Sequence, residues 1–462
     1  MNSRTFKNEL DYLFNEFAGA MTTGIIRALQ NCPGVFMSFV SRPLLLAISL
    51  SLPLSALAAK PVKPVPAAAA EFELAHNLGG HGEEALKMVV ERFNKEAAAN
   101  LKVVRHEKGQ KPSALTLVSR YDMADVLTNP KAFVPLHELM AKSGEPLNVN
   151  EMSADLKAGV VDARGRLVAL PVAYSTPVLF YNKTAFRKAG LDPEQPPKTW
   201  FEMQGMLDKL QSAGYSCPYT TSWPVWVHID NVSAVSGVPA MSDKGVLTFN
   251  GLPQVKHLAM MTTWVKAGYF KTYGRRVEGS AKFEAGECAM ITTDSREAVD
   301  FREAKGVELG VAPLPFHDDV YGGRQHTLAD GASLWVGAGQ SAANRKLAAK
   351  FISFMLKPEM QIEMVRSYGQ MPLTAAARAA VRSKILINED ASLQVAYASL
   401  KGNGSKPAVR VANIDPVRII ANEELEAAFA DTKPPKAALD AAVSRGNAVL
   451  NAKPALKKSQ PF

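Results

Sequence analysis

Short apolar runs alternate along this chain with stretches in which apolar residues recur every three or four positions. Residues 82–96 show the second pattern, which places Leu86, Val89, Val90 and Phe93 on one face of a predicted helix. Continuous apolar runs, typical of buried strands, occur at 101–104, 114–118, 166–175, 178–182, 288–293, 308–314 and 332–337. This alternation of strands with amphipathic helices predicts an α/β protein.

Local signals at the ends of the helices support the same prediction. Thr199 and Glu202 have the spacing of a capping box, so we expect a helix to begin there and to end at Gly214. Further helical patterns cover 183–189, 254–266, 342–356, 359–367, 418–430 and 435–450. The expected fold class is therefore α/β with a helical C-terminal third.

The N-terminal region has the pattern of an export signal. Arg42 precedes the uncharged run PLLLAISLSLPLSALAA, and the small residues Ala56 and Ala58 match a signal-peptidase site. We predict a cleaved signal peptide over 1–58 with a long N-terminal extension, for which Met37 is an alternative start. An uncleaved anchor is less favoured, because a membrane span needs about 20 apolar residues. The signal peptide is followed by a Pro/Ala-rich spacer over 59–70. We expect the mature protein to be periplasmic.

Composition narrows the function classes. The 462 residues are 47% hydrophobic and 21% charged, which excludes a disordered chain. The net charge of +9 comes from scattered basic residues, so no nucleic-acid partner is expected. No CxxC motif is present among Cys32, Cys217 and Cys288, which argues against zinc ribbons. In an oxidising compartment Cys217 and Cys288 are able to pair, but two separate buried thiols fit the sequence equally well.

Catalytic chemistry has no clear motif in this sequence. The phosphate-binding loop, the dinucleotide fingerprint, the zincin motif and the nucleophile elbow are all missing. His76, His81 and His106 cluster near the N-terminus but lack carboxylates at metal-binding spacing. We therefore expect no enzyme, no metal and no cofactor, and an exported hydrolase is kept only as the alternative class. A solute receptor with its ligand in a cleft between two lobes fits better.

Several longer segments carry a family resemblance. The segments STPVLFYNKTAFRKAGLDPEQPPKTW (175–200), KFEAGECAM (282–290), GASLWV (331–336) and VRIIANEELEAAF (417–429) resemble periplasmic solute-binding proteins of ABC importers, extracellular solute-binding protein family 1. Within that family they are most similar to the glycerol-3-phosphate-binding branch, over roughly 170–450.

The resemblance implies a hinged, two-lobe periplasmic binding protein of type II. The N-terminal lobe would comprise 71–174 and about 328–368, and the C-terminal lobe 175–327 and about 369–462. It also implies a monomer that delivers sn-glycerol-3-phosphate or a glycerophosphodiester to an inner-membrane permease.

Three ligand contacts of the family match residues of this chain. Arg418 would pair with the phosphate, because a guanidinium has a fixed charge and a planar set of donors. Gly331 would let a backbone N–H approach the ligand, and Ser175 would contact it from the hinge side. Trp200 matches a family tryptophan near the cleft and is expected to form part of its wall.

Other family positions have changed in this chain. A family glutamate falls near Asp122, and the family's pocket tyrosine is Gln370 here. Asp294 and Asp330 stand where the family has small residues. A carboxylate about 4 Å from a phosphate costs about 4 kcal/mol at an effective dielectric constant of 20.

Three interpretations of these two aspartates remain open. They point away from the cleft, or they bind a cationic head group such as choline, or the pocket has changed to accept a neutral sugar or polyol.

Overall fold

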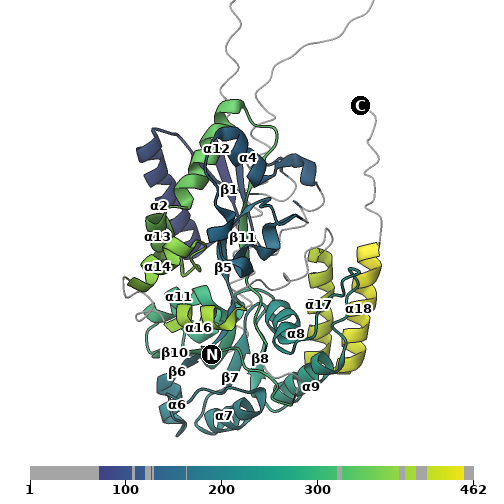
Figure 1. The fold of residues 1–462 in the computed structure, drawn as a ribbon. Helices are drawn as coiled ribbons and strands as arrows, with labels where there is room; N and C mark the ends of the chain where they lie inside the picture. The colour runs from purple at the N-terminus through teal and green to yellow at the C-terminus, as the bar shows by residue number, and fades with distance from the viewer. Residues whose placement is uncertain are drawn as a thin grey trace, which may run out of the picture. The chain divides into compact units, whose positions relative to one another are not determined.

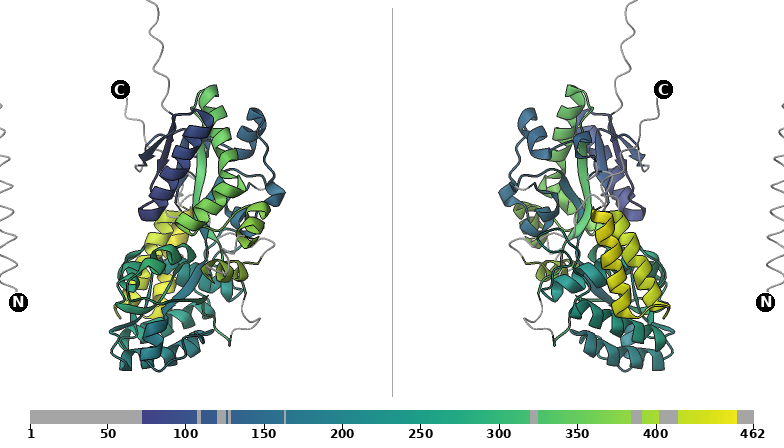
Figure 2. Two further views of the ribbon diagram at one scale, coloured as in Figure 1. Left: turned by 90° about the vertical axis from the view of Figure 1, so that its left-hand side faces the viewer. Right: turned by 90° about the vertical axis from the view of Figure 1, so that its right-hand side faces the viewer.

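The computed structural model describes residues 72–106, 110–119, 126, 129–162, 164–319, 325–383, 391–401 and 414–451. These residues form two β-sheets with helices packed around them (Figures 1 and 2), which confirms the predicted α/β fold. The predicted signal peptide over 1–58 and the spacer over 59–70 lie outside the described residues.

The first sheet has the strand order β2-β1-β3-β11-β4, and β5 also pairs with β11. Its strands are β1 (Glu73–His76), β2 (Lys102–Arg105), β3 (Leu115–Val118), β4 (Phe133–Val134), β5 (Leu170–Ser175) and β11 (Asp330–Gly337). Strands β1, β2 and β3 are parallel, whereas β11 is antiparallel to its neighbours. All residues of β3, β5 and β11 are buried, as their continuous apolar runs predict.

Helices from two separate stretches of the chain, 80–157 and 342–383, accompany this sheet. They are α2 (Gly80–Ala97), α4 (Leu136–Ser143), α5 (Ala154–Lys157), α12 (Ala342–Met355), α13 (Pro358–Tyr368) and α14 (Ala375–Ser383), with short 3₁₀ turns at Pro130–Ala132, Val149–Glu151 and Ala158–Val160. Helix α2 buries the predicted face of Leu86, Val89, Val90 and Phe93. Helices α2 and α13 pack against each other although they lie far apart in sequence (Figure 1).

The second sheet has the order β10-β6-β9-β7-β8. Its strands are β6 (Pro177–Asn182), β7 (Cys217–Thr221), β8 (Phe270–Lys271), β9 (Cys288–Asp294) and β10 (Leu309–Pro313). Its helices are α6 (Lys183–Lys188), α7 (Trp200–Ser212), the π-helix η4 (Trp226–Asn231), α8 (Val232–Val235), α9 (Leu252–Lys266), α10 (Glu278–Glu284), the 3₁₀ turn η5 (Ser295–Glu297), α11 (Ala298–Glu303), α16 (Ala391–Ser399), α17 (Ile414–Phe429) and α18 (Pro435–Asn451). Figure 2 shows α17 and α18 side by side, and both contact α9.

One residue, Thr176, joins the two sheets between β5 and β6. Its carbonyl accepts a hydrogen bond from Ser295 N (3.0 Å), and its hydroxyl donates to Thr327 Oγ1 (2.5 Å). The strand registers place Asp330 opposite Ser175 in the first sheet and Asp294 opposite Pro177 in the second. Asp294 and Asp330 therefore flank the crossing from opposite sides.

Local signals in the second sheet behave as predicted. Helix α7 begins with the capping box, in which Glu202 N donates to Thr199 Oγ1 (3.1 Å) and Thr199 N donates to Glu202 Oε2 (3.3 Å). Of the two alternatives for the cysteines, a disulfide or two separate thiols, the structure shows the first: Cys217 and Cys288 form a disulfide. They are register partners on the parallel neighbours β7 and β9.

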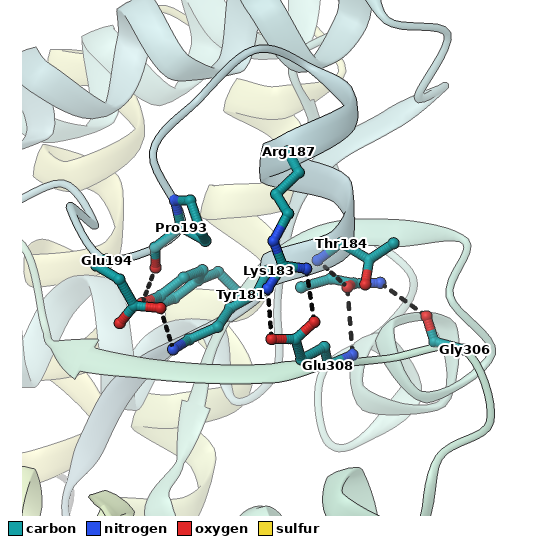
Figure 3. A network of polar contacts seen from close by, with 9 residues as sticks. Tyr181, Lys183, Thr184, Arg187, Pro193, Glu194, Gly306 and Glu308 are labelled. Atoms are coloured by element: carbon teal, nitrogen blue, oxygen red, sulfur yellow. Dashed lines mark hydrogen bonds and ion pairs between the residues drawn. The ribbon is translucent and has the colours of Figure 1, made fainter.

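Polar contacts fix the outer edge of the second sheet (Figure 3). Both guanidinium Nη atoms of Arg187 on α6 bind the carboxylate of Glu308 at 2.6 Å. Lys183 Nζ binds Glu194 at 2.7 Å, and the Tyr181 hydroxyl donates to the Pro193 carbonyl at 2.8 Å. Exposed ion pairs contribute little free energy, typically about 0–1 kcal/mol. This network therefore orients the α6 corner but adds little to the stability of the fold.

Candidate ligand-binding site

A cavity of about 550 Å³ is lined by residues that come from both sheets and their helices. The first-sheet side supplies Asn77, Leu78, Gly79, Gly80, His81, Ser119, Gly331, Ala332 and Tyr368. The second-sheet side supplies Trp223, Arg276, Val277, Ser280, Ala281, Glu284, Arg296, Glu297, Val299, Asp300 and Phe301. This volume and the mixture of aromatic, apolar and charged groups suit one small polar solute.

Arg296 is one of the charged groups in this lining. Its Nε lies 3.0 Å from Asp294 Oδ1 and its Nη2 lies 2.5 Å from Asp294 Oδ2, so the pair is bidentate. The guanidinium also contacts the Tyr368 hydroxyl and lies 4.7 Å from the centre of that ring. Burial alone would lower the pKa of Arg296, but the Asp294 carboxylate and Tyr368 outweigh it and raise that pKa. The charge of Asp294 is thus compensated by an arginine that joins α13 to the end of β9.

Asp330 is compensated in a similar way. Its Oδ2 lies 3.5 Å from Arg418 Nη2, both side chains are buried, and its Oδ1 accepts a hydrogen bond from Gly331 N (2.8 Å). The strand registers place Ser175 and Asp294 on either side of the crossing, and Asp330, paired with Arg418, lies opposite Ser175. None of these four residues is among those that line the cavity, so the predicted contacts of Ser175 and Arg418 with a ligand are not seen there. Each aspartate pairs with an arginine and neither is among the cavity-lining residues, which agrees with the interpretation that both carboxylates point away from the cleft.

Gly331 lines the cavity, but the structure gives a different reason for a glycine at this position from the expected contact with the ligand. A Cβ at this position would lie 2.0 Å from the carbonyl oxygen of Ala173 on β5, so glycine permits the close approach of β5 and β11. Its N–H already donates to Asp330.

We expect Gly331→Ala to lower the free energy of unfolding by about 1–3 kcal/mol, because backbone atoms must move to admit the methyl group. Urea unfolding followed by circular dichroism measures this difference. Gly339→Ala is the matched control, since a Cβ there meets no atom within 4 Å. An equal effect of both variants would contradict the packing explanation.

Three other predicted site residues have different outcomes. Trp200 is 1% exposed and packs in the core of the second sheet, with its ring 4.8 Å from that of His257, because it lies on the inner face of α7. The structure thus does not place Trp200 on the cavity wall, contrary to the expectation. Gln370 is buried, whereas Tyr368, two residues earlier, lines the cavity. Asp122 lies outside the described residues.

Several cavity residues have no counterpart in the sequence predictions. Trp223 follows β7 with a left-handed backbone (φ 55°), and its backbone N–H donates to the Arg276 carbonyl at 2.9 Å. Such a conformation costs a non-glycine residue about 1–3 kcal/mol and is typical of functional sites. Glu297 also lines the cavity, where burial, followed by the nearby Asp294, raises its pKa to about 8.

No group of three or more side chains suited to a metal ion occurs in the part of the chain that the structure describes. Within those same ranges, no helix combines the length and the apolar character needed to cross a membrane.

Two sheets joined by a short crossing, with a cavity lined from both, agree with the two-lobe architecture that the family resemblance implies. The family described as "Bacterial extracellular solute-binding protein" matches residues 67–392, and the chain belongs to this family. It is 34% identical over 408 residues to the sn-glycerol-3-phosphate-binding periplasmic protein UgpB of Pectobacterium atrosepticum, which covers 83% of this chain and 92% of the relative. It is 35% identical over 331 residues to UgpB of Escherichia coli K12, covering 69% of this chain and 76% of the relative.

Solved structures agree on the fold. The crystal structure of UgpB from Mycobacterium tuberculosis in complex with glycerophosphocholine has a TM-score of 0.70 at 18% identity, covering 82% of this chain and 98% of that one. Maltose-bound MalE3 of T. maritima has a TM-score of 0.67 at 19% identity, with 82% and 100% covered. The predicted family and its periplasmic location are confirmed by the family match and the curated relatives.

Proposed function

We propose that this protein is the periplasmic receptor of an ABC importer and binds sn-glycerol-3-phosphate in the cavity between its two sheets. The observation that supports an anionic ligand is the pairing of Asp294 with Arg296 and of Asp330 with Arg418. Because each carboxylate is compensated by an arginine, the two aspartates no longer repel a bound phosphate as the sequence alone suggests. Arg276 contributes a cationic group to the lining in addition to Arg296, whose charge is compensated by Asp294.

Binding would act through closure of the two lobes. A ligand that touches groups of both sheets binds the closed form more tightly and shifts the population toward it. His81 on α2 and Asp300 on α11 already meet across the cavity rim, with Nε2 and Oδ1 2.9 Å apart. The closed receptor would then present the ligand to a membrane permease as a monomer, without covalent chemistry and without a nucleic-acid partner.

A glycerophosphodiester with a cationic head group is the second candidate. The rings of Trp223 and Tyr368 and the carboxylates of Glu284 and Asp300 line the same cavity. An aromatic face attracts a quaternary ammonium group.

Calorimetric titration of the purified protein tests both candidates. We expect saturable 1:1 binding of sn-glycerol-3-phosphate at pH 7.5 and no heat of binding with maltose, the control for a neutral sugar. Binding of glycerophosphocholine alone would assign the site to the diester. Binding of maltose alone would contradict the proposed function.

A further inference from the structure

Arg276, in the loop between β8 and α10, is an exposed residue that lines the cavity. The other basic side chains among the described lining residues are His81, which lies 2.9 Å from Asp300, and Arg296. The Arg296 side chain is only 15% exposed and is engaged with Asp294. Arg418, which the family resemblance assigns to the phosphate, is buried and does not line the cavity. Arg276 is therefore the arginine of this lining that is most open to an entering solute.

Two hydrogen bonds hold the backbone of Arg276 in place. Its carbonyl accepts from the backbone N–H of Trp223 at 2.9 Å, and its own N–H donates to Glu278 Oε2 at 2.7 Å. Trp223 also lines the cavity, so the first of these bonds ties the loop to the cavity wall. The preceding residue, Arg275, instead makes a bidentate pair with Glu426 of α17, with both contacts at 2.6 Å. Two adjacent arginines thus differ, because Arg275 is bound to α17 and Arg276 belongs to the cavity wall.

We propose that Arg276, rather than Arg418, is the specificity-determining residue that pairs with the phosphate of the bound monoester. This proposal rests on the proposed function, since it assigns the ligand's anionic end to the wall before α10. A guanidinium suits this role because it has a fixed charge and donors that match phosphate oxygens. The same lining contains the acidic residues Glu284, Glu297 and Asp300, so an anion needs a cationic partner in order to bind there. A neutral sugar would gain no such charge interaction.

The test is the dissociation constant for sn-glycerol-3-phosphate at about pH 7.5, where the ligand is mainly a dianion, measured by calorimetry on the full protein. Arg276→Gln should weaken binding roughly 10- to 100-fold, because it removes a charge-assisted contact. Arg276→Lys keeps the charge but not the planar set of donors, so its loss should be smaller. Raising NaCl from about 50 to about 500 mM should weaken binding by the wild type more than by Arg276→Gln, since salt screens an accessible ion pair.

Arg275→Gln is the matched control, since it removes the same charge one residue away, and it should keep the wild-type affinity and salt dependence. Unchanged affinity in Arg276→Gln would overturn this inference and leave the proposed function standing. An equal loss in Arg275→Gln would also overturn it, because general attraction by basic residues would then explain the effect. Absence of any binding by the wild type would overturn the proposed function and this inference with it. Should Arg276→Gln fail to fold, the wild type and Arg276→Lys decide the point, and wild-type affinity that does not change with salt would contradict the proposal.

Discussion

The free energy of unfolding of this protein is expected to fall by several kcal/mol between pH 6.5 and pH 4.5. Three histidines in the core of the second sheet form a chain, with 2.9 Å between His228 Nδ1 and His257 Nε2 and 3.1 Å between His257 Nδ1 and His317 Nε2. The Tyr219 hydroxyl lies 3.3 Å from His228 Nε2 at one end. Neutral rings that each donate from Nδ1 satisfy every contact in this chain.

Burial sets the sign of this effect. It lowers the pKa of His228 to about 3, that of His257 well below its usual value and that of His317 to about 4. In the unfolded chain these rings titrate near pH 6.5. The stability that they contribute is therefore fully present above pH 6.5 and is lost as the pH falls toward 3–4. Each ring contributes up to about 1.4 kcal/mol per pH unit, so the two fully buried rings amount to roughly 5 kcal/mol over two units.

Urea unfolding at a series of pH values measures the slope. His228→Gln removes one titrating ring. Below pH 6.5 it should reduce the slope of the unfolding free energy against pH by up to about 1.4 kcal/mol per pH unit, the contribution of one proton. His326→Gln, at an exposed position, is the control and should leave the slope unchanged. Equal slopes for the wild type and His228→Gln would show that acid sensitivity comes from other groups.

Most of the fold follows from signals that lie within one element. The capping box of α7, the buried face of α2 and the apolar runs of β5, β6 and β9 are each readable over fewer than 20 residues. Strand β1 (Glu73–His76) is not, because its four residues include a glutamate and a histidine and show no clear period. Trp200 shows where the family resemblance gave a wrong prediction. It matches a family position near the cleft, but it lies on the inner face of α7 and is buried with Met203 and Leu207.

The site depends on contacts that no local pattern encodes. Arg296 and Glu297 look like ordinary turn residues in the sequence. Asp294 is only two residues before Arg296, but the contact of Arg296 with Tyr368, 72 residues away, exists only in the folded chain. The charge balance at Asp330 likewise requires Arg418, which lies 88 residues away along the chain. From sequence, both aspartates therefore look like an obstacle to phosphate binding, whereas in the structure each is half of an ion pair.

Loss of the disulfide is expected to be comparable in size to the effect of pH. Cys217 and Cys288 are each 1% exposed and lie on adjacent strands of the second sheet, separated by 71 residues of chain. In the loop-entropy description, a cross-link over such a loop stabilises the folded state by about 4 kcal/mol, with measured values spanning about 2–5. The double variant Cys217→Ala with Cys288→Ala should therefore unfold at a distinctly lower urea concentration than the oxidised wild type.

Adding a reductant to the variants distinguishes loss of this disulfide from other effects of the reducing agent. A reductant should lower the stability of the wild type and of Cys32→Ser alike, because Cys32 lies in the predicted signal peptide, but it should not change the double variant further. The closed loop carries Trp223, Arg276 and Glu284, three of the cavity residues. Because the β7–β9 ladder remains without the bridge, binding at 25 °C should change little while stability falls. A double variant as stable as the oxidised wild type would mean that the ladder alone holds this segment in place.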